Sequence, residues 1–536
     1  MRKSNIKKLK KPVKLINKDQ IDIKEDIESI VEININSITS DLTTNIHIIN
    51  SLLAKSYDLR FRYIDISTIP TTKSVVIYLE SITDTNKLES TVIAPLMQGI
   101  VERCLDERVR FSASPYAIVK EILINSSIKV MEDISMIIDE VLVGKGILFI
   151  DGYSSAIIID IAREADKKST EPKTEKIING PQEAFVEDIE SNIYILRKRI
   201  KSKDFVIKEL QIGEVNRSTV KVLYINNIAD AKIVDELFSR LNTIKIDTIY
   251  GSASLKEYIN DSPLNIFPTI YSTERPDRVE AMLLEGRVAI ICDVCPIALV
   301  VPSVVSDFFS TPEEYYINFY FATFNRVIGY IGAFIVMFLP SIYISLTTFH
   351  QEMIPTSLAL TLAGTRAGVP YPAFVEALMM ELAFEALRQA GTRLPTHVGQ
   401  AVSIVGALII GQAAVEAGLV SPAVVIVVAI TAIFSFTMPY NNFSMALRLT
   451  RFFNMALAAI LGIYGVMTGG LLILLNLLSL RSFSVPLMAP FSPLNLEDMR
   501  DWVFRFPQWT ITKRSSDIIK DNLKKKSSNL KPTTKK

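Results

Sequence analysis

The chain has 536 residues, of which 49% are hydrophobic and 21% are charged. Its 58 basic and 57 acidic side chains leave a formal net charge of +1, which argues against a general nucleic-acid binder, because such a protein carries a basic excess on one domain. The charge is concentrated before Phe308 and after Leu496, with several long apolar runs between them. This partition predicts a soluble region followed by a membrane region.

The N-terminal arm, residues 1–34, is basic, and no apolar core follows its first 14 residues. This is not the pattern of a secretory signal. Lysines mixed with serine and asparagine predict a solvated, disordered arm, and contact with a membrane surface is the alternative.

Three cysteines, Cys104, Cys292 and Cys295, are too few for a disulfide framework and fit a reducing compartment. Cys292 and Cys295 have the C-x-x-C spacing of redox and zinc sites, but the three histidines are scattered along the chain. We therefore expect no metal site and interpret the two thiols as small buried residues.

A first α/β unit is predicted over residues 35–162. Its elements are indicated by helical spacing of apolar residues, by runs rich in Val and Ile, and by a hairpin turn that begins at Asp151. In chain order we expect a helix at 40–56, strands at 59–66 and 74–79, helices at 88–98, 115–124 and 130–143, and strands at 146–150 and 156–161.

A second α/β unit is predicted over residues 182–268, after a linker at 163–181 in which Lys, Glu, Pro and Gly break the pattern. This unit also begins with a helix, continues through a strand pair and returns to helix, which suggests a duplication. The expected elements are a helix at 183–200, strands at 205–212 and 219–225, and helices at 229–241 and 254–260.

The soluble half has no enzyme motif: it contains no phosphate-binding loop, no dinucleotide fingerprint, no nucleophile elbow and no H-E-x-x-H. Asp151 and Asp160 could be imagined as an acid/base couple, but carboxylates at strand edges are usually solvated. We expect neither catalysis nor a cofactor.

The coupling segment, residues 269–307, joins the soluble and membrane regions. Its charges predict a lock between the two regions, and a solvated linker helix is the alternative. The apolar run at 288–305 is interrupted by Asp293, Pro296 and Pro302, and we interpret it as re-entrant or interfacial. The residues assigned to coupling are Glu274, Arg275, Pro276, Asp277, Glu285 and Arg287.

An all-α multi-pass membrane domain is predicted over residues 308–495, because a span needs about 20 apolar residues. The basic tail, residues 496–536, is expected to stay in the cytoplasm with the N-terminal half, and two cytoplasmic ends require an even number of spans. Arg448 and Arg451 would then lie outside, which counts against this topology. The expected spans lie near 328–349, 401–419, 422–439 and 453–480, with an amphipathic helix at 370–390.

Polar side chains within the membrane domain are the candidate ion path. Gln412 and Glu416 are four residues apart, so they share a helix face. Glu416 fits either a cation path or a hydrated position near a helix end. In the amphipathic helix, Glu381 and Glu385 share a face with Arg388. This face predicts either a solvated interfacial helix or, in several assembled copies, an acidic ring at a pore mouth.

Long, ordered motifs resemble the A subunit of the GerA family of spore-germination nutrient receptors. The resemblance extends over roughly residues 35–495, and its motifs lie at 180–181, 185–187, 273–277, 284–291, 399–407 and 411–418. Two places depart from the family. Val294 follows Asp293 where Asp-Gly-Thr-Pro is common, and Ser484 and Leu487 replace a usual Gly and Tyr. The loop geometry after Asp293 is therefore in question.

The resemblance implies a multi-pass protein of the dormant spore's inner membrane, with its N-terminal region and C-terminal tail in the cytoplasm. It implies a receptor shared with a permease-like B subunit, which receives the nutrient, and with a lipoprotein C subunit. It also implies that the A subunit forms a homo-oligomer among membrane lipids and transmits the signal, as a channel for cations.

Three classes of function therefore compete. The first is an oligomeric cation channel that responds to a nutrient bound by a partner. The second is a non-conducting signalling scaffold whose α/β units bind a partner. The third is a secondary transporter, for which a pair of repeat-related broken helices is expected and no clear pair is found.

Overall fold

A computed structural model describes residues 38–53, 56–66, 72–97, 123, 128–164, 170–393, 411–496, 498–519 and 522–525. The predicted arm 1–34, Cys104, most of the predicted helix 115–124 and the first ten residues of the predicted span 401–419 lie outside these ranges. The chain divides into a first unit (1–54, 58–165 and 201–203) and a second unit (55–57, 166–200 and 204–536).

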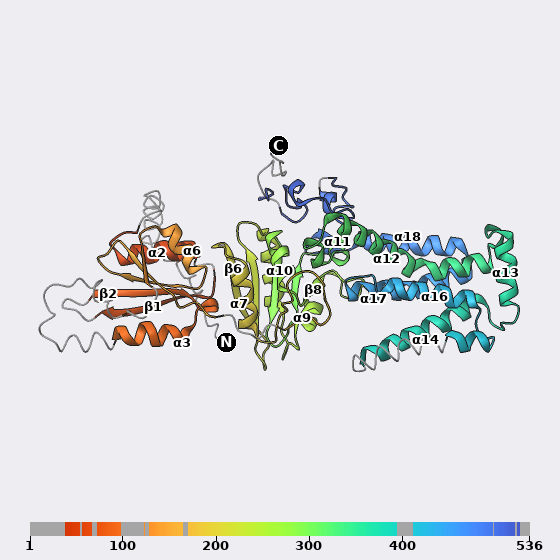
Figure 1. The fold of residues 1–536 in the computed structure, drawn as a ribbon, viewed down its shortest axis with the longest axis horizontal. Helices are drawn as coiled ribbons and strands as arrows, with labels where there is room; N and C mark the ends of the chain where they lie inside the picture. Colours follow the sequence, from red (N-terminus) through yellow and green to blue (C-terminus); the bar gives the residue numbers. More distant parts are fainter. Residues whose placement is uncertain are drawn as a thin grey trace, which may run out of the picture. The chain divides into compact units, whose positions relative to one another are not determined.

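The first unit is a five-stranded antiparallel sheet with the strand order β1-β2-β4-β5-β3. Figure 1 shows α2 and α6 on one face of this sheet and α3 on the other. All residues of β4 and β5 are buried, since these strands have neighbours on both sides and helices on both faces. The elements are α2 (Leu42–Leu53), β1 (Leu59–Ile66), β2 (Thr72–Leu79), α3 (Thr85–Leu88, continued by a π-helix at Glu89–Ile93), β3 (Ile128–Met131), α6 (Ile134–Val141), β4 (Gly146–Ile150) and β5 (Ala156–Ile159).

One element of the first unit was predicted wrongly. Residues 128–131 form the edge strand β3 and not the start of a helix at 130–143. The helix begins only after Asp133, whose side chain accepts a hydrogen bond from the backbone N–H of Ser135 at 2.8 Å. The N-cap at Asp133 thus separates the strand from the helix.

The second unit contains a sheet with the order β6-β7-β9-β10-β8, and all of its pairings are antiparallel. Helices α7 and α10 pack on one face in one hydrophobic cluster, and α8 and α9 pack on the other face in a second cluster. The elements are α7 (Ile189–Arg199), β6 (Phe205–Ile212), β7 (Ser218–Ile225), α8 (Ala231–Thr243), α9 (Ser252–Ile259), β8 (Tyr271–Thr273), α10 (Pro276–Leu284), β9 (Val288–Cys292) and β10 (Ala298–Val301).

The two sheets have the same topology. If the strands of each sheet are counted in chain order, both sheets run first, second, fourth, fifth, third. In each, the helix between the third and fourth strands is followed by a glycine of positive φ two residues before the fourth strand: Gly144 (φ +100°) and Gly286 (φ +86°). The suspected duplication is thus confirmed at the level of topology.

This duplication corrects the predicted boundary at residue 268. The second sheet takes β8, β9 and β10 from the coupling segment, so residues 271–301 complete the second α/β unit. The interpretation of 288–305 as a re-entrant or interfacial stretch was wrong for the same reason. Its apolar residues are buried because both faces of β9 and β10 are covered.

The loop after Asp293 keeps a left-handed turn although glycine is absent. Val294 has φ +59°, and Gly152, which follows Asp151 in the equivalent hairpin of the first unit, has φ +88°. Ser484, in the turn between β11 (Arg481–Ser482) and β12 (Val485–Pro486), has φ +68°. Both positions where the family commonly has glycine therefore adopt a conformation that favours glycine.

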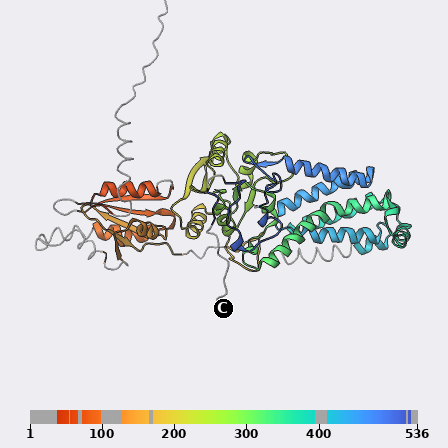
Figure 2. The same cartoon turned by 90° about the horizontal axis from the view of Figure 1, so that it is seen from above.

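The remainder of the second unit is mainly helical, as Figure 2 shows. Helix α12 packs against α16, α17 and α18, and α14 packs against α12, α16 and α17. The amphipathic helix predicted at 370–390 corresponds to α14. The helices are α11 (Val305–Phe309), α12 (Phe319–Thr348), α13 (Thr356–Arg366), α14 (Ala373–Arg393), α16 (Pro422–Ser435), α17 (Asn441–Leu461) and α18 (Ile463–Ser479).

Among the described residues, α12 and α17 are long and apolar enough to cross a membrane, by length and composition, whereas α16 and α18 are shorter apolar helices. The prediction of one span at 453–480 was wrong. Gly462, with φ +60°, separates α17 from α18, and the two helices pack against each other. The apolar run is continuous in sequence, but the chain turns back within it.

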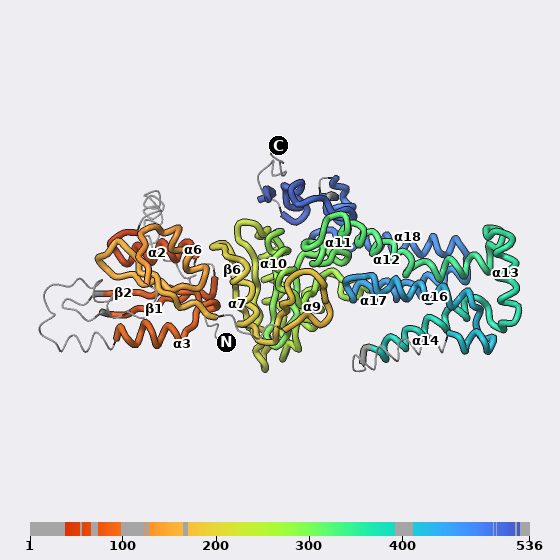
Figure 3. The backbone as a smooth tube through the Cα atoms, in the orientation of Figure 1, coloured from red at the N-terminus to blue at the C-terminus, as the bar shows by residue number. Residues whose placement is uncertain are grey.

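The C-terminal segment returns to the second sheet. Figure 3 shows the tube of residues 498–519 near α10 and α11. Ile518 and Ile519 belong to the same hydrophobic cluster as Val279 and Met282 of α10. This part of the predicted tail is therefore packed against the fold and contributes to its core.

Candidate functional site

The coupling segment begins with a turn that its sequence specifies locally. Arg275 has extended backbone angles, φ −104° and ψ 121°, as a residue before proline prefers. Pro276 then occupies the first turn of α10, where a backbone N–H has no hydrogen-bond acceptor within the helix, so proline loses nothing there. Asp277 places a negative charge near the helix N-terminus, which the helix dipole favours. The motif 273–277 is thus the link between β8 and α10.

Arg275 is completely buried and binds several groups at once. Its Nε and Nη2 donate to the Asp277 carboxylate at 3.1 and 2.8 Å. Nη1 donates to the carbonyl of Glu175 at 3.2 Å, and Nη2 donates to the carbonyl of Pro181 at 2.8 Å. Residues 175 and 181 of the predicted linker 163–181 are therefore bound to the coupling segment.

Glu274 binds the same part of the chain. Its Oε1 accepts hydrogen bonds from the backbone N–H groups of Thr174 and Glu175 at 2.6 and 2.8 Å. The carboxyl group of Glu175 in turn accepts a hydrogen bond from Thr273 Oγ1 at 2.7 Å. Burial raises the pKa of Glu175 from its usual 4.5 to about 7, although the bond from Thr273 favours the charged form.

A second cluster connects α10 and β9 to α11. Arg287 forms a buried, two-contact ion pair with Asp307, with Nη2 at 2.9 Å from Oδ1. Arg278 donates to the carbonyl of Asp307 at 3.2 Å and to Ser310 Oγ at 2.5 Å, and its guanidinium carbon lies 5.3 Å from the ring centroid of Tyr271. Asp307 thus holds two arginines of the coupling segment.

Glu285 points toward the C-terminal segment. Its carboxylate lies 3.5 Å from Lys525 Nζ and 3.9 Å from Arg287 Nη2, with the Glu285 side chain 30% exposed. Contacts of this length at partial exposure contribute little to stability. Glu285 is therefore a weak link compared with Arg275 and Arg287.

Buried Arg326, which was not predicted as a functional residue, forms two further ion pairs. Arg326, in the first turns of α12, has Nε 2.6 Å from Glu314 and Nη1 2.9 Å from Asp501. The group joins α12 to the turn before it and to the C-terminal segment. A single arginine near the start of a long apolar helix was the available signal.

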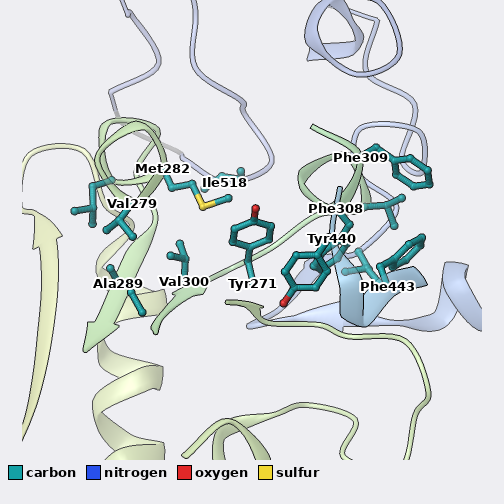
Figure 4. Close-up of a cluster of buried hydrophobic side chains, with 14 of the residues drawn as sticks. Tyr271, Val279, Met282, Ala289, Val300, Phe308, Phe309, Tyr440, Phe443 and Ile518 are labelled. Atoms are coloured by element: carbon teal, nitrogen blue, oxygen red, sulfur yellow. The ribbon is translucent and has the colours of Figure 1, made fainter. Parts of the chain in front are cut away.

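An aromatic cluster, shown in Figure 4, connects the sheet to the helices. Tyr271 of β8 stacks on Tyr440 at a centroid distance of 5.0 Å, and Phe308 of α11 stacks on Phe443 of α17 at 5.3 Å. Phe308 also lies 4.9 Å from Tyr440. The backbone N–H of Ser272 donates to Tyr440 Oη at 3.1 Å. The contact between β8 and α17 is therefore aromatic and apolar, with one polar contact at its edge.

The proposed ion-path residues fall into two groups. Glu381 and Glu385 of α14 form ion pairs with Arg451 and Arg448 of α17, and the Glu381–Arg451 distance is 2.9 Å. Gln412 and Glu416 are exposed, and Gln412 Nε2 donates to Glu416 Oε1 at 2.9 Å, as their spacing predicts. No contact links Glu381 or Glu385 to the described Gln412 and Glu416. The basic partners of Glu381 and Glu385 come from α17, which the sequence did not predict.

The two described cysteines are not arranged as a metal site. Cys292 is buried in β9, where burial raises the pKa of its thiol to about 12, and Cys295 Sγ lies 2.9 Å from Ser252 Oγ. Within the described ranges, no group of three His, Cys, Asp or Glu side chains could hold a metal ion.

Most of the chain is similar in sequence to known proteins. A family model described as Bacillus/Clostridium GerA spore germination protein matches residues 47–517. Spore germination protein KA of Bacillus subtilis is 39% identical over 90% of this chain and 88% of its own length. Spore germination protein B1 of the same organism is 36% identical over 91% of this chain and 100% of its length. An uncharacterized membrane protein of Bacillus subtilis, YfkQ, is 35% identical over 90% of this chain and 93% of its own length.

One solved structure is also similar. It is the crystal structure of the N-terminal domain of the A subunit of the Bacillus megaterium spore germinant receptor GerK3. The likeness covers 50% of this chain and 97% of that chain, at 27% identity and a TM-score of 0.39.

Proposed function

Because the chain belongs to the Bacillus/Clostridium GerA family of spore germination proteins, we propose that it is the A subunit of a spore germinant receptor. In this role it passes a nutrient signal from partner subunits to its membrane helices. The observation that carries the proposal is the burial of Arg278 and Arg287, which bind Asp307 of α11. A shift of α10 would act directly on Asp307 of α11.

We propose the inner membrane of the spore as its location, with a permease-like B subunit and a lipoprotein C subunit as partners. Two span-length helices and the membrane-protein name of one relative support a membrane location. We also propose a multi-pass topology with both termini in the cytoplasm, which the lysines of the tail support.

We further propose that several copies of this chain form a cation-conducting channel. Glu416 and Gln412 are favoured as lining residues, because both are exposed and Glu416 forms no ion pair within the described part of the chain. Glu381 and Glu385 would join the path only if α14 separates from α17, since Arg451 and Arg448 neutralise them here. Opening of the channel would then include the breaking of these two pairs.

The channel is tested with the full chain and its B and C subunits in planar bilayers, with nutrient added on either side. We expect a cation current that Glu416→Gln reduces. Glu352→Gln removes the same charge from an exposed position outside the proposed path and should leave the current unchanged. Absence of current in every condition, together with normal germination of Glu416→Gln spores, would exclude conduction by this chain.

A non-conducting signalling scaffold is the second candidate function. It is favoured by the ion pairs of Glu381 and Glu385, which leave these carboxylates bound to α17. The scaffold predicts that Glu381→Ala impairs germination through lower protein stability alone. A second substitution that restores stability would then restore germination without any change in ion flux.

A further inference from the structure

A cavity of about 170 Å³ lies where α10 and α11 meet the C-terminal segment. Its lining includes Arg278 of α10, Arg287 before β9, Arg326 of α12, and Arg514 of the C-terminal segment. One water molecule needs a space of about 10–15 Å³, so the cavity can hold a small polyatomic ligand. Basic groups from four separate parts of the chain therefore surround a space of useful size.

The acidic groups that line this cavity already have partners. Asp307 is paired with Arg287, and Asp501 is paired with Arg326. The remaining two are Glu285, which lies near Lys525, and Asp498, which accepts from the backbone N–H of Ser516 at 3.0 Å. The carboxylates are thus committed to other groups.

Arg278 has no such partner. It is 4% exposed, yet it forms no ion pair with a carboxylate of the described residues. Its Nη2 donates to a carbonyl and a hydroxyl oxygen, and its Nε has no hydrogen-bond partner there. The carboxylates of Asp307 and Glu285 act on Arg278 only at longer range. A buried guanidinium group that has no anion in direct contact is costly, because burial removes the water that would stabilise it.

Arg514 faces the same cavity from the C-terminal segment. It donates to the carbonyl of Leu284 at 2.9 Å and to the carbonyls of Asn522 and Lys524 at 3.1 and 2.9 Å. All of these acceptors are neutral. The cavity is therefore lined by two guanidinium groups, Arg278 and Arg514, that form no direct ion pair with a carboxylate of the described residues.

We propose that this cavity binds a small phosphate-type dianion between Arg278 and Arg514. A guanidinium group presents paired N–H donors that match the oxygen atoms of a phosphate group. The bound anion would connect α10 to the C-terminal segment, so occupancy controls how firmly that segment holds the coupling segment. This site does not depend on whether the chain conducts cations. The phosphate group belongs either to a soluble anion or to the headgroup of an acidic lipid.

The test uses the full chain in an uncharged detergent. Binding of radiolabelled inorganic phosphate is measured by equilibrium dialysis, and thermal unfolding is followed at constant ionic strength. We expect one saturable site and a rise in Tm with phosphate. Arg278→Met should weaken binding about tenfold or more, since a charge-assisted hydrogen bond is lost. Arg217→Gln, on an exposed turn outside the cavity, is the matched control.

Arg514→Gln is the second variant, because its half-buried side chain can be replaced even if Arg278→Met fails to fold. A parallel arm uses phosphatidylcholine vesicles with and without phosphatidic acid. Binding of inorganic phosphate identifies a soluble anion, and Arg-dependent stabilisation by phosphatidic acid alone identifies a lipid headgroup. If neither probe binds, or if Arg278→Met and Arg514→Gln bind like the unsubstituted chain, the proposal is wrong.

Discussion

The guanidinium group of Arg451 lies 2.9 Å from the carboxylate of Glu381, and neither side chain is more than 2% exposed. The pair joins α14 to α17 inside the helical region. Removal of one member leaves the other charge buried and unpaired. Replacement of both members removes the two desolvation costs together, so single and double variants should differ sharply.

Glu381→Ala should therefore lower the free energy of unfolding by about 3–5 kcal/mol. Glu381→Leu combined with Arg451→Met should cost much less, because no charge remains in the apolar contact. Thermal unfolding of the purified chain in detergent measures both. Glu80→Ala, which breaks the exposed Arg60–Glu80 pair, is the control and should cost less than about 1 kcal/mol. Equal losses in the single and double variants would contradict this account.

Arg275 should be needed to hold residues 170–181 in place. Arg275→Lys keeps the charge but cannot reproduce the simultaneous contacts to Asp277 and to the carbonyls of Glu175 and Pro181. We expect faster backbone hydrogen exchange across 170–181 in this variant, and a stronger effect in Arg275→Glu. Lys198→Arg tests for general effects of substitution. Unchanged exchange in Arg275→Glu would show that the segment is held by other contacts.

Glu175 should make stability depend on pH. Its pKa rises from 4.5 in the unfolded chain to about 7 in the fold, so between these values the folded protein holds a proton that the unfolded chain has lost. The stability from this group is complete below pH 4.5 and falls as the pH approaches 7, by at most about 1.4 kcal/mol per pH unit.

Glu175→Gln removes this titration. The variant should match the unsubstituted chain near pH 4.5 and exceed it in stability above pH 7, as measured by denaturant unfolding across that range. Glu214→Gln, at an exposed turn, is the control for the loss of one carboxyl group elsewhere in the second unit. A parallel shift of the whole curve in Glu175→Gln would mean that the carboxyl group does not titrate in this window.

Val294→Gly should stabilise the second unit. A β-branched residue at φ +59° is strained by about 1–2 kcal/mol, and glycine relieves this at an entropic cost of about 0.5–1 kcal/mol. The net gain should be up to about 1.5 kcal/mol in thermal unfolding. Val215, which is equally exposed but has no positive φ, provides the control: Val215→Gly should be neutral or destabilising. A loss of stability in Val294→Gly would show that the turn is not strained.

Gly465 should be required for the α17–α18 hairpin. A Cβ atom at this position would lie 2.1 Å from the backbone oxygen of Leu457, so Gly465→Ala forces the helices apart. We expect a loss of about 1–3 kcal/mol or more and a lower yield of folded protein. Gly364, in α13, has open space around it, and Gly364→Ala should be neutral or slightly stabilising. Similar behaviour of the two variants in thermal unfolding would contradict this packing.

The duplication shows what the sequence could and could not predict. Local patterns correctly located β1, β2, β4, β5, β6 and β7. The alternation of apolar and polar residues and the runs rich in Val and Ile are each contained within a single strand, so they can be recognised without knowledge of the fold. The boundary at 268 failed because β8 has only three residues and β9 and β10 resemble an interrupted span. If the repeat had been extended, residues 271–301 would have been aligned with β3 to β5, and the Asp-Gly turn at Asp151 would have been aligned with Asp293.

The partners of the charged groups were not predictable in the same way. Glu381 and Arg451 are 70 residues apart, and the pair forms only when α14 packs against α17. Helical spacing predicted that Gln412 and Glu416 meet, because both lie on one helix. It carried no information on Arg278, whose place between α11 and the C-terminal segment depends on the complete fold.

The packing of Ile518 and Ile519 against α10 has a consequence for biosynthesis. A ribosome releases these residues only after every helix from α11 to α18 has been made, yet they share a hydrophobic cluster with Val279 and Met282. Gly286 accommodates them, since a Cβ there would lie 2.5 Å from Ile519. The coupling segment therefore reaches its final packing only after Ile518 and Ile519 have been made, and a chain that stops before them presents an apolar patch on α10 to the quality-control machinery of the cell.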